Sequence, residues 1–321
     1  MKQLTPRFRI AAVSLVAVTA LVGALVVAPA NAAEKRLTIT LISHCDGGSF
    51  WSVAKKGALA AGTDSRVVVS WQCSNNDAVK QAQLIETAVT KKVDGIAVSV
   101  PNYGAIKAAV AKAVKAGIPV VTFNSGSADF EKLGAITHVG QDETVAGNGA
   151  GKQFKAASLK NLLCVIHETG NSSLEDRCAG AKATFGGTVT NMYVKGHSDP
   201  TTTVNQISAK LTADKTIDAV LTLDPDIALN ALDAKTSAGS SAKIGTFDLS
   251  AGVVAAIKAG TIMFGVDQQQ YLQGYLAVSF LVLNVRNANT VGGGLPVMTG
   301  PGFVTKDNAA KVEALAKAGT R

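Results

Sequence analysis

Polar side chains that donate or accept hydrogen bonds follow several apolar, strand-like runs of this sequence. Asp224 follows "DAVLTL", Asp248 follows "IGTF" and Gln268 follows "FGVD". Such residues are also common in turns and helix caps, and Asp248 could cap the helix predicted from "SAGVVAAIKAG". Together they predict an edge rich in carboxylate and amide groups, which can bind ligand hydroxyls.

Arg177, in "GNSSLEDRCAG", is the one basic residue that this pattern brings in with an obvious purpose. Phosphate or carboxylate ligands would favour more Lys or Arg, or a Gly-rich loop. A small neutral polyhydroxyl ligand suits the residues better, because each hydroxyl both donates and accepts hydrogen bonds. Carboxylate and amide oxygens can take its protons, and Arg177 or amide N–H groups can serve its lone pairs.

Two aromatic residues, Phe50 and Trp51, stand at the turn of the strand–turn–helix segment "LISHCDGGSFWSVAKKGA". Either ring could lie against the apolar C–H face of a sugar or polyol. We expect at least one of the two to pack inward against the first helix instead. The sequence does not say which one contacts the ligand.

Catalytic motifs such as G-x-S-x-G, H-E-x-x-H or G-x-G-x-x-G do not occur in the sequence. Asp224 and Asp248 could imitate the two acids of a glycosidase, which keeps a secreted glycosidase-like enzyme as an alternative. Hydrogen bonding to a ligand explains the pair equally well, so we expect a protein that is not an enzyme. A metal site would recruit His44 and His167 to the thiols, but no metal-binding spacing appears. We therefore expect no metal and no cofactor.

Short apolar runs alternate with Ala- and Lys-rich segments of helical period along the chain. The predicted strands are 37–42, 66–71, 95–100, 118–123, 135–139, 162–166, 188–194, 219–223, 243–247 and 262–266. This alternation predicts two five-strand α/β units in series, each with a parallel sheet covered by helices on both faces. Ligands of open α/β sheets bind beyond the carboxyl ends of the strands. The polar residues should therefore line a cleft between the two units.

Residues 1–32 have the pattern of a secretory signal peptide. A cationic start (Lys2, Arg7 and Arg9) precedes a long apolar run and a small-residue cleavage site at Ala30–Ala32. The apolar run is almost long enough for an uncleaved membrane anchor, but Pro29 and the A-x-A pattern favour cleavage. We expect export to the periplasm and a mature chain that begins near Ala33.

The charge of the mature chain is modest. Loss of the signal peptide leaves 28 of the 31 Lys and Arg residues against 23 Asp and Glu, a formal charge of +5. These charges are spread thinly, without a basic cluster or a basic helix, so we expect no nucleic-acid partner.

Four cysteines in an exported chain predict disulfide bonds. Three pairings are possible, and the sequence alone does not decide among them. Cys45 and Cys73 both follow predicted strands, whereas Cys164 and Cys178 bracket one strand–turn–helix step. We favour Cys45–Cys73 and Cys164–Cys178.

Eight segments in order carry a resemblance to a known family: "SFWSVAKKGA", "VDGIAVSVPN", "KAGIPVVTFNSG", "THVGQDETVAGNGAG", "GNSSLEDRCAG", "DAVLTLDPDIALNAL", "IGTFDLSAGVVAAIKAG" and "FGVDQQQYLQGYLAV". The chain resembles the exported solute-binding proteins of ABC sugar importers of the ribose-binding-like type, the type I periplasmic binding proteins. The resemblance implies two similar doubly wound parallel-sheet α/β domains joined by a three-segment hinge. We expect one lobe from residues 34–140 plus 269–298 and the other from 141–268 plus 299–321.

The resemblance also implies a function and roles for single residues. A monomer would capture a small sugar or sugar alcohol between the lobes and deliver it to a membrane ABC permease. Phe50 and Trp51 match the family's stacking aromatics, and Arg177 matches its hydroxyl-binding arginine. Asn124, Asp224, Asp248 and Gln268 match its polar ligand-binding positions.

Departures from the family pattern limit the choice of ligand. Ribose binders carry Asp-Arg where this chain has Asn124-Ser125, and "HETGNSS" with its cysteine pair is not typical of them. Pentoses, hexoses, inositols and sugar alcohols therefore stay open. A related transcription regulator is disfavoured by the export signal and by the lack of a helix-turn-helix. A ligand-loaded sensor that docks on a chemoreceptor or histidine kinase remains an alternative.

Overall fold

The structure, a computed structural model, describes residues 36–321. The predicted signal peptide and its cleavage site lie outside the described residues. No helix among residues 36–321 combines the length and apolar character that a membrane span requires.

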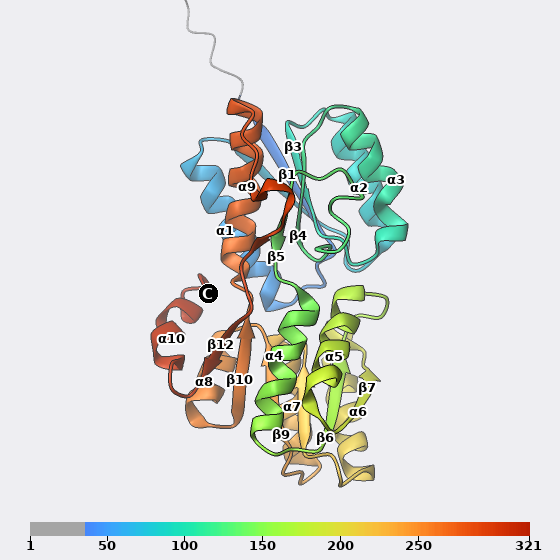
Figure 1. The fold of residues 1–321 in the computed structure, drawn as a ribbon, viewed down its shortest axis with the longest axis vertical. Coiled ribbons are helices and arrows are strands. Elements are labelled where there is room, and N and C mark those ends of the chain that lie inside the picture. Colours follow the sequence, from blue (N-terminus) through green and yellow to red (C-terminus); the bar gives the residue numbers. More distant parts are fainter. Residues whose placement is uncertain (1–35) are drawn as a thin grey trace, which may run out of the picture. The chain divides into compact units, whose positions relative to one another are not determined.

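Residues 36–321 contain two six-stranded sheets (Figure 1). The first has the order β11-β5-β4-β3-β1-β2 and is parallel throughout. Its strands are β1 (Thr38–Ser43), β2 (Val68–Cys73), β3 (Gly95–Val98), β4 (Val120–Asn124), β5 (His138–Gly140) and β11 (Val297–Met298). We call this sheet and the helices packed on it the first half.

The second sheet has the order β12-β10-β9-β8-β6-β7. Its strands are β6 (Asn161–Ile166), β7 (Thr188–Tyr193), β8 (Ala219–Thr222), β9 (Lys243–Phe247), β10 (Ile262–Asp267) and β12 (Gly302–Thr305). Strand β12 runs antiparallel to β10, and the other pairs are parallel. This sheet and its helices form the second half.

The ten predicted strands are all present, but the expected count of five strands per sheet is wrong. Strands β11 and β12 add a sixth strand to the edge of each sheet. Strand β11 is two residues long and β12 four. Both lie in a segment with Gly and Pro between short apolar runs, where neither a period of two nor a continuous apolar run can be recognised.

The helices have these bounds: α1 (Ser49–Asp64), α2 (Ala78–Thr90), α3 (Tyr103–Lys115), α4 (Glu143–Ala156), α5 (Ser172–Phe185), α6 (Pro200–Ala213), α7 (Pro225–Ser237), α8 (Ala251–Ala259), α9 (Gln270–Asn287) and α10 (Ala309–Lys317).

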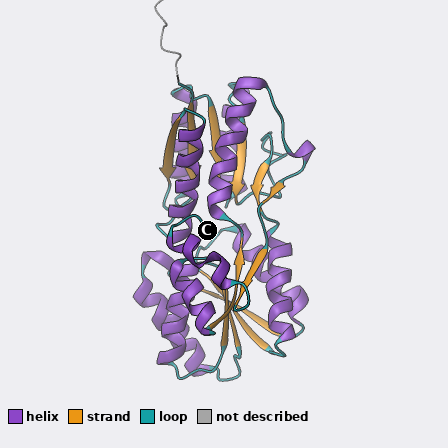
Figure 2. Cartoon of the chain, turned by 90° about the vertical axis from the view of Figure 1, so that its left-hand side faces the viewer, coloured by secondary structure: helices purple, strands orange, loops and turns teal. Residues whose placement is uncertain are grey.

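Helices cover both faces of each sheet (Figure 2). In the first half, Ile39 and Leu41 of β1 face α1 and α9, whereas Ile42 of the same strand faces α2 and α3. In the second half, Leu162 and Cys164 of β6 face α4 and α5, and Leu163 faces α6, α7 and α8. Because side chains alternate along a strand, both faces of each sheet are buried, as a doubly wound fold requires.

Helices α1 and α9 pack closely because Gly57 and Gly274 carry no side chain. A Cβ at either position would lie 2.0 Å from a backbone oxygen of the other helix.

The chain crosses between the halves three times. It passes from β5 to α4, from β10 to α9 and from β11 to β12. These are the three hinge segments that the family resemblance implies. The residue boundaries of the two lobes stay a prediction.

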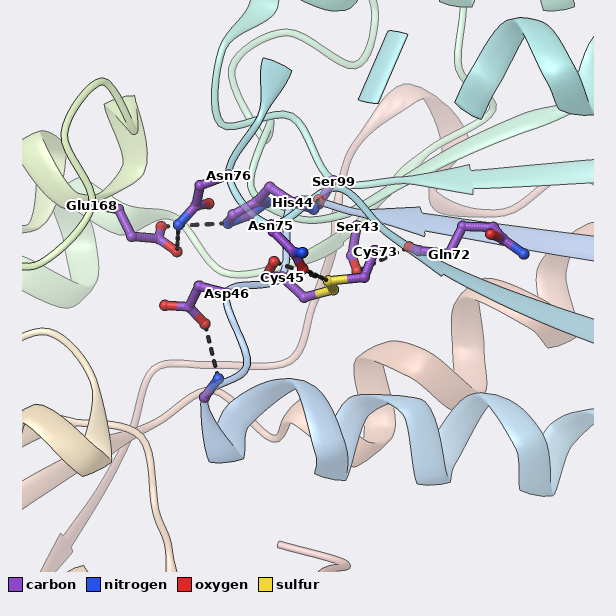
Figure 3. The surroundings of a disulfide bond; sticks show 11 residues. Ser43, His44, Cys45, Asp46, Gln72, Cys73, Asn75, Asn76, Ser99 and Glu168 are labelled. Atoms are coloured by element: carbon purple, nitrogen blue, oxygen red, sulfur yellow. Dashed lines mark hydrogen bonds and ion pairs between the residues drawn. A yellow bond between two sulfur atoms is a disulfide. The ribbon is translucent and has the colours of Figure 1, made fainter. Parts of the chain in front are cut away.

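Two disulfide bonds join the predicted pairs of cysteines. Cys45, just after β1, bonds to Cys73 at the end of the neighbouring strand β2 (Figure 3). Cys164 of β6 bonds to Cys178 of α5 in the core of the second half. The first bond therefore joins the carboxyl ends of two neighbouring strands, and the second joins a strand to the helix packed on it.

Candidate functional site

A cavity lies where the carboxyl ends of the strands of the two halves meet. Its empty volume, which includes space open to solvent, is about 340 Å³. The seven side chains predicted as ligand-binding all line it: Phe50, Trp51, Asn124, Arg177, Asp224, Asp248 and Gln268. The structure thus gathers residues that are more than 200 positions apart in the sequence.

The two aromatic residues open helix α1 and are both buried. Phe50 is 4% exposed and Trp51 7%, and their rings meet edge to face with centroids 4.9 Å apart. Both rings belong to the apolar core beneath α1 and α9. Trp51 also contacts His44 edge-on at 4.7 Å. Both rings therefore pack inward over most of their surface while each also borders the cavity.

Arg177 is held rigidly by side-chain and backbone partners. Its Nε donates to Glu143 Oε2 at 2.6 Å, its Nη2 donates to Glu143 Oε1 at 3.0 Å, and its Nη1 donates to the Leu223 carbonyl at 3.0 Å. The guanidinium lies over the Phe247 ring, 4.5 Å from the centroid. This two-pronged ion pair leaves the guanidinium pre-oriented at the cavity wall, with its charge balanced by Glu143.

Asp248 is a buried carboxylate beside Arg177. It is 2% exposed, and its Oδ1 accepts a hydrogen bond from Gln268 Nε2 at 2.8 Å. Burial raises its pKa well above the usual value, although Arg177 and Gln268 pull the pKa down. The N-cap of α8 is Ser250, whose Oγ accepts from Val253 N. The alternative in which Asp248 caps this helix is therefore wrong.

Asp224 combines the two roles that the sequence left open. Its Oδ1 caps α7 by accepting from Asp226 N and Ile227 N, and the side chain also lines the cavity. Burial opposes its charge, but His197 and the helix N–H groups hold its pKa below the usual value. Asn124 ends β4 with φ 62°, and its Oδ1 accepts from Ser125 Oγ at 3.0 Å.

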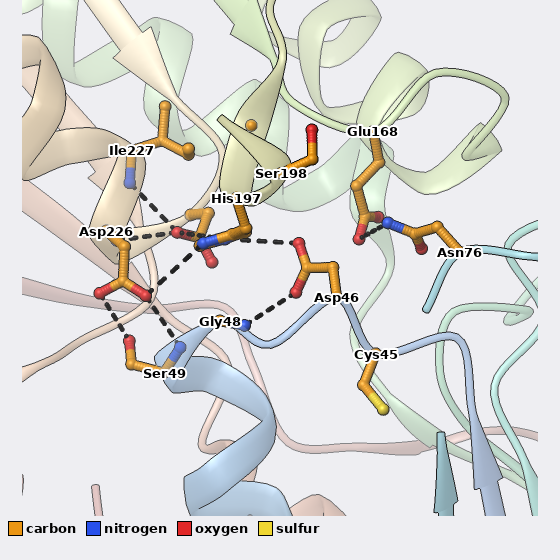
Figure 4. Close-up of polar contacts among 12 residues, drawn as sticks. Cys45, Asp46, Gly48, Ser49, Asn76, Glu168, His197, Ser198, Asp226 and Ile227 are labelled. Carbon is orange, nitrogen blue, oxygen red and sulfur yellow. Dashed lines mark hydrogen bonds and ion pairs between the residues drawn. The ribbon is translucent and has the colours of Figure 1, made fainter. Parts of the chain in front are cut away.

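Four side chains that we call the interface cluster lie beside the cavity: His197, Asp46, Asp224 and Asp226. Figure 4 labels His197, Asp46 and Asp226. His197 Nε2 is 3.2 Å from Asp224 Oδ1 and 3.4 Å from Asp46 Oδ2. Neither contact is aligned as a hydrogen bond, so we describe both as ion pairs. Burial lowers the pKa of His197, but the three carboxylates outweigh burial and raise it to about 9.

The interface cluster links the two halves. Asp46 follows β1 in the first half, whereas the other three members belong to the second half. Asp226 also accepts hydrogen bonds from Ser49 N at 2.8 Å and Ser49 Oγ at 3.0 Å, at the start of α1. Within residues 36–321, two groups of three side chains are close enough to share a metal ion. One group is Asp46, His167 and His197, and the other is His197, Asp224 and Asp226. The imidazolium of His197 already supplies a cation between these carboxylates.

Glu168 forms a second polar link between the halves. Its Oε2 accepts from Asn171 Nδ2 and lies 3.6 Å from His44 Nε2, while its Oε1 accepts from Asn76 Nδ2 at 3.0 Å. Burial opposes the charge, but His44 and Asn171 hold the pKa of Glu168 below the usual range. His44 in turn contacts Ser99 through its ring and its backbone N–H.

Sequence reasoning missed several of these residues. Asp46 and Glu168 follow the first and sixth strands, so the strand-end criterion that selected Asp224 could have found them. His44 and His167 were considered only as metal ligands. Glu143 lies at the start of a helix, and His197 follows β7 within a short turn, so no strand-end signal marks either one.

Residues 39–288 match the family model described as periplasmic binding protein domain. The ribose import binding protein of Bacillus subtilis is 27% identical over 267 residues, covering 78% of this chain and 82% of its own length. The xylose/arabinose-binding protein of Sulfolobus acidocaldarius is 24% identical over 299 residues, covering 84% and 71%.

Solved structures have the same fold. A carbohydrate transporter from Acidothermus cellulolyticus 11B, in complex with myo-inositol, is 45% identical with a TM-score of 0.87, covering 89% of this chain and 100% of that one. A periplasmic sugar-binding protein from Legionella pneumophila, 24% identical, has a TM-score of 0.76 and covers 82% and 99%. The chain therefore belongs to the periplasmic binding protein family, in its ribose-binding-like type I group.

Proposed function

We propose that this protein is an exported solute-binding protein that captures a small neutral sugar or sugar alcohol in the cavity and delivers it to a membrane ABC permease. A cleaved signal peptide would take the chain to the periplasm, where it would act as a monomer. Myo-inositol is the first candidate ligand, because the 45% identical structure contains it.

The observation that carries this proposal is the chemical character of the cavity wall. Carboxylate, amide and imidazole groups come from both halves, and two aromatic rings border the same space. A cyclic polyol presents hydroxyls around its edge and C–H groups on its faces, so it can satisfy both kinds of wall at once.

The charges of the wall favour a neutral ligand. Arg177 is the one Lys or Arg among the described residues that line the cavity, and Glu143 and the Leu223 carbonyl already engage its guanidinium. Glu168 and Asp224, whose pKa values lie below the usual value, would repel a phosphate or a carboxylate. An inositol phosphate or a uronic acid should therefore bind far more weakly than the neutral parent compound.

Binding explains the two aspartates better than catalysis does. The family consists of substrate-binding proteins. Asp224 Oδ1 already accepts two backbone hydrogen bonds as a helix cap, and Asp248 Oδ1 is held by Gln268. Incubation with aryl glycosides should release no aglycone.

A thermal-shift screen tests the proposal. The mature protein is unfolded in the presence of myo-inositol, ribose, xylose, glucose and linear alditols, with inositol phosphate and glucuronate as charged controls. A ligand at 100 times its Kd should add about 2.7 kcal/mol to the free energy of unfolding. Stabilisation by a neutral polyol but not by its charged analogue supports the proposal. Stabilisation by the charged compounds alone would refute it.

A further inference from the structure

The amide of Gln268 is held between Asp248 and a second glutamine, Gln273. Its Nε2 donates to Asp248 Oδ1 at 2.8 Å, and its Oε1 accepts from Gln273 Nε2 at 2.9 Å. If this amide were turned over, its oxygen would face the carboxylate and its NH2 group would face another NH2 group. Gln273 and Asp248 therefore both favour the orientation in which the NH2 group of Gln268 faces the Asp248 carboxylate.

Gln273 does not itself line the cavity. It lies on α9, in the first half, and is fully buried. Its Nε2 is also 3.1 Å from the Gln268 carbonyl and 3.2 Å from Thr299 Oγ1. Thr299 in turn donates from Oγ1 to the Gln268 carbonyl at 2.7 Å and contacts the Gly140 carbonyl at 3.1 Å. Gln273 thus reaches the point where the three chain crossings come together.

The two ends of the Gln273 amide are used unequally. Gln273 Oε1 is buried and has no hydrogen-bond partner among the described residues. An unpaired buried acceptor costs free energy, which an apolar side chain of the same length would avoid. All the hydrogen bonds of this side chain therefore come from its NH2 group, and the shortest of them goes to Gln268 Oε1. Gln270 Oε1 is also unpaired within residues 36–321, so the contact with Gln268 is what distinguishes Gln273.

We propose that Gln273 is a positioning residue for the ligand site: it orients the Gln268 amide so that Gln268 holds the Asp248 carboxylate in place for ligand hydroxyls. This inference rests on the proposed function, since it assigns a role within the same binding site. It links α9 of the first half to a carboxylate at the end of β9 in the second half.

The test compares Gln273→Met with Gln270→Met. Gln270 lies on the same helix, is also fully buried and donates to the Leu249 carbonyl instead of Gln268. Calorimetric titration with myo-inositol should give a Kd about tenfold higher for Gln273→Met, the loss expected when one hydrogen bond to a charged group is misdirected. Gln270→Met should stay within about twofold of the wild type.

A double variant shows whether Gln273 acts through Gln268. Gln268→Met alone should weaken binding, and adding Gln273→Met should then have no further effect. If the two substitutions weakened affinity independently, so that their fold-changes in Kd multiplied in the double variant, the proposal would be contradicted. An unchanged Kd for Gln273→Met would also contradict it. If that variant fails to fold, Gln273→Asn carries the same expectation, because the shortened amide cannot reach Gln268.

The wild-type titration keeps this test separate from the test of function. A wild-type protein that binds neither myo-inositol nor any neutral sugar of the screen refutes the proposed function and this inference together. A wild-type protein that binds while Gln273→Met binds equally well refutes only the role of Gln273.

Discussion

Among the single residues of the site, two buried aspartates have pKa values shifted in opposite directions. Asp248 is buried so deeply that its pKa rises, whereas Asp224 is surrounded by His197 and backbone N–H groups that lower its pKa. A carboxyl group with a raised pKa destabilises the folded protein at neutral pH, because folding must bury its charge or take up a proton. Such a residue is best explained by its use toward a ligand.

Replacement of Asp248 tests this interpretation. Asp248→Ala should weaken ligand affinity about tenfold to a hundredfold, while the free energy of unfolding without ligand stays the same or rises. Ser250→Ala is the matched control, because Ser250 caps α8 two residues away. It should lose about 1 kcal/mol of stability and keep its affinity. If Asp248→Ala instead lost stability and kept its affinity, Asp248 would leave the list of site residues.

His197 should make stability depend on pH. Its pKa rises from 6.5 to about 9 in the folded protein, so its contribution is complete below pH 6.5 and is lost as the pH rises through about 9. After allowance for solvent screening, we expect a loss on the order of 2 kcal/mol. Urea unfolding of wild type and His197→Gln between pH 6 and 10 measures it. If the free energy of unfolding changed equally with pH in the wild type and in His197→Gln, the ion pairs of His197 would not contribute to stability as described.

At the scale of elements, most of the fold could be predicted because strands and helices have distinct periods. The predicted strand of residues 243–247 coincides with β9, and "GAIKAAVAKAVKAG" forms α3 with the apolar face on its sheet. Strands β11 and β12 could not be recognised, because pairing with the edge of an existing sheet, not a local pattern, makes them strands. Glu143 and His197 were missed for a related reason: their importance arises from neighbours more than 20 residues away.

The two disulfide bonds should stabilise the fold by joining pairs of secondary-structure elements. Alkylation of the denatured, unreduced mature protein should find no free thiol by mass spectrometry. Each bond should contribute on the order of 3 kcal/mol by limiting the unfolded chain, so reduction should lower the melting temperature. The double variants Cys45→Ser/Cys73→Ser and Cys164→Ser/Cys178→Ser assign the loss to each bond. Detection of two reactive cysteines in the unreduced wild type would show that one of the two disulfide bonds does not form.

At the scale of the whole described chain, direct contacts join the two halves around the cavity. Ser49 bonds to Asp226, Asn76 bonds to Glu168, and Ser172 N donates to the Pro101 carbonyl at 3.1 Å. We expect these contacts to break when ligand enters or leaves, since the three crossings permit a hinge motion. The partners come from separate elements of the two halves, so local sequence patterns could not predict these contacts.

One small neutral polyol should bind between the two halves. Calorimetric titration of the mature wild-type protein with myo-inositol tests it most directly, with Asp248→Ala titrated alongside. We expect saturable binding of one ligand per chain, weakened about tenfold to a hundredfold by the substitution. Absence of binding by the folded wild type to myo-inositol and to every other neutral sugar or alditol in the screen would contradict it.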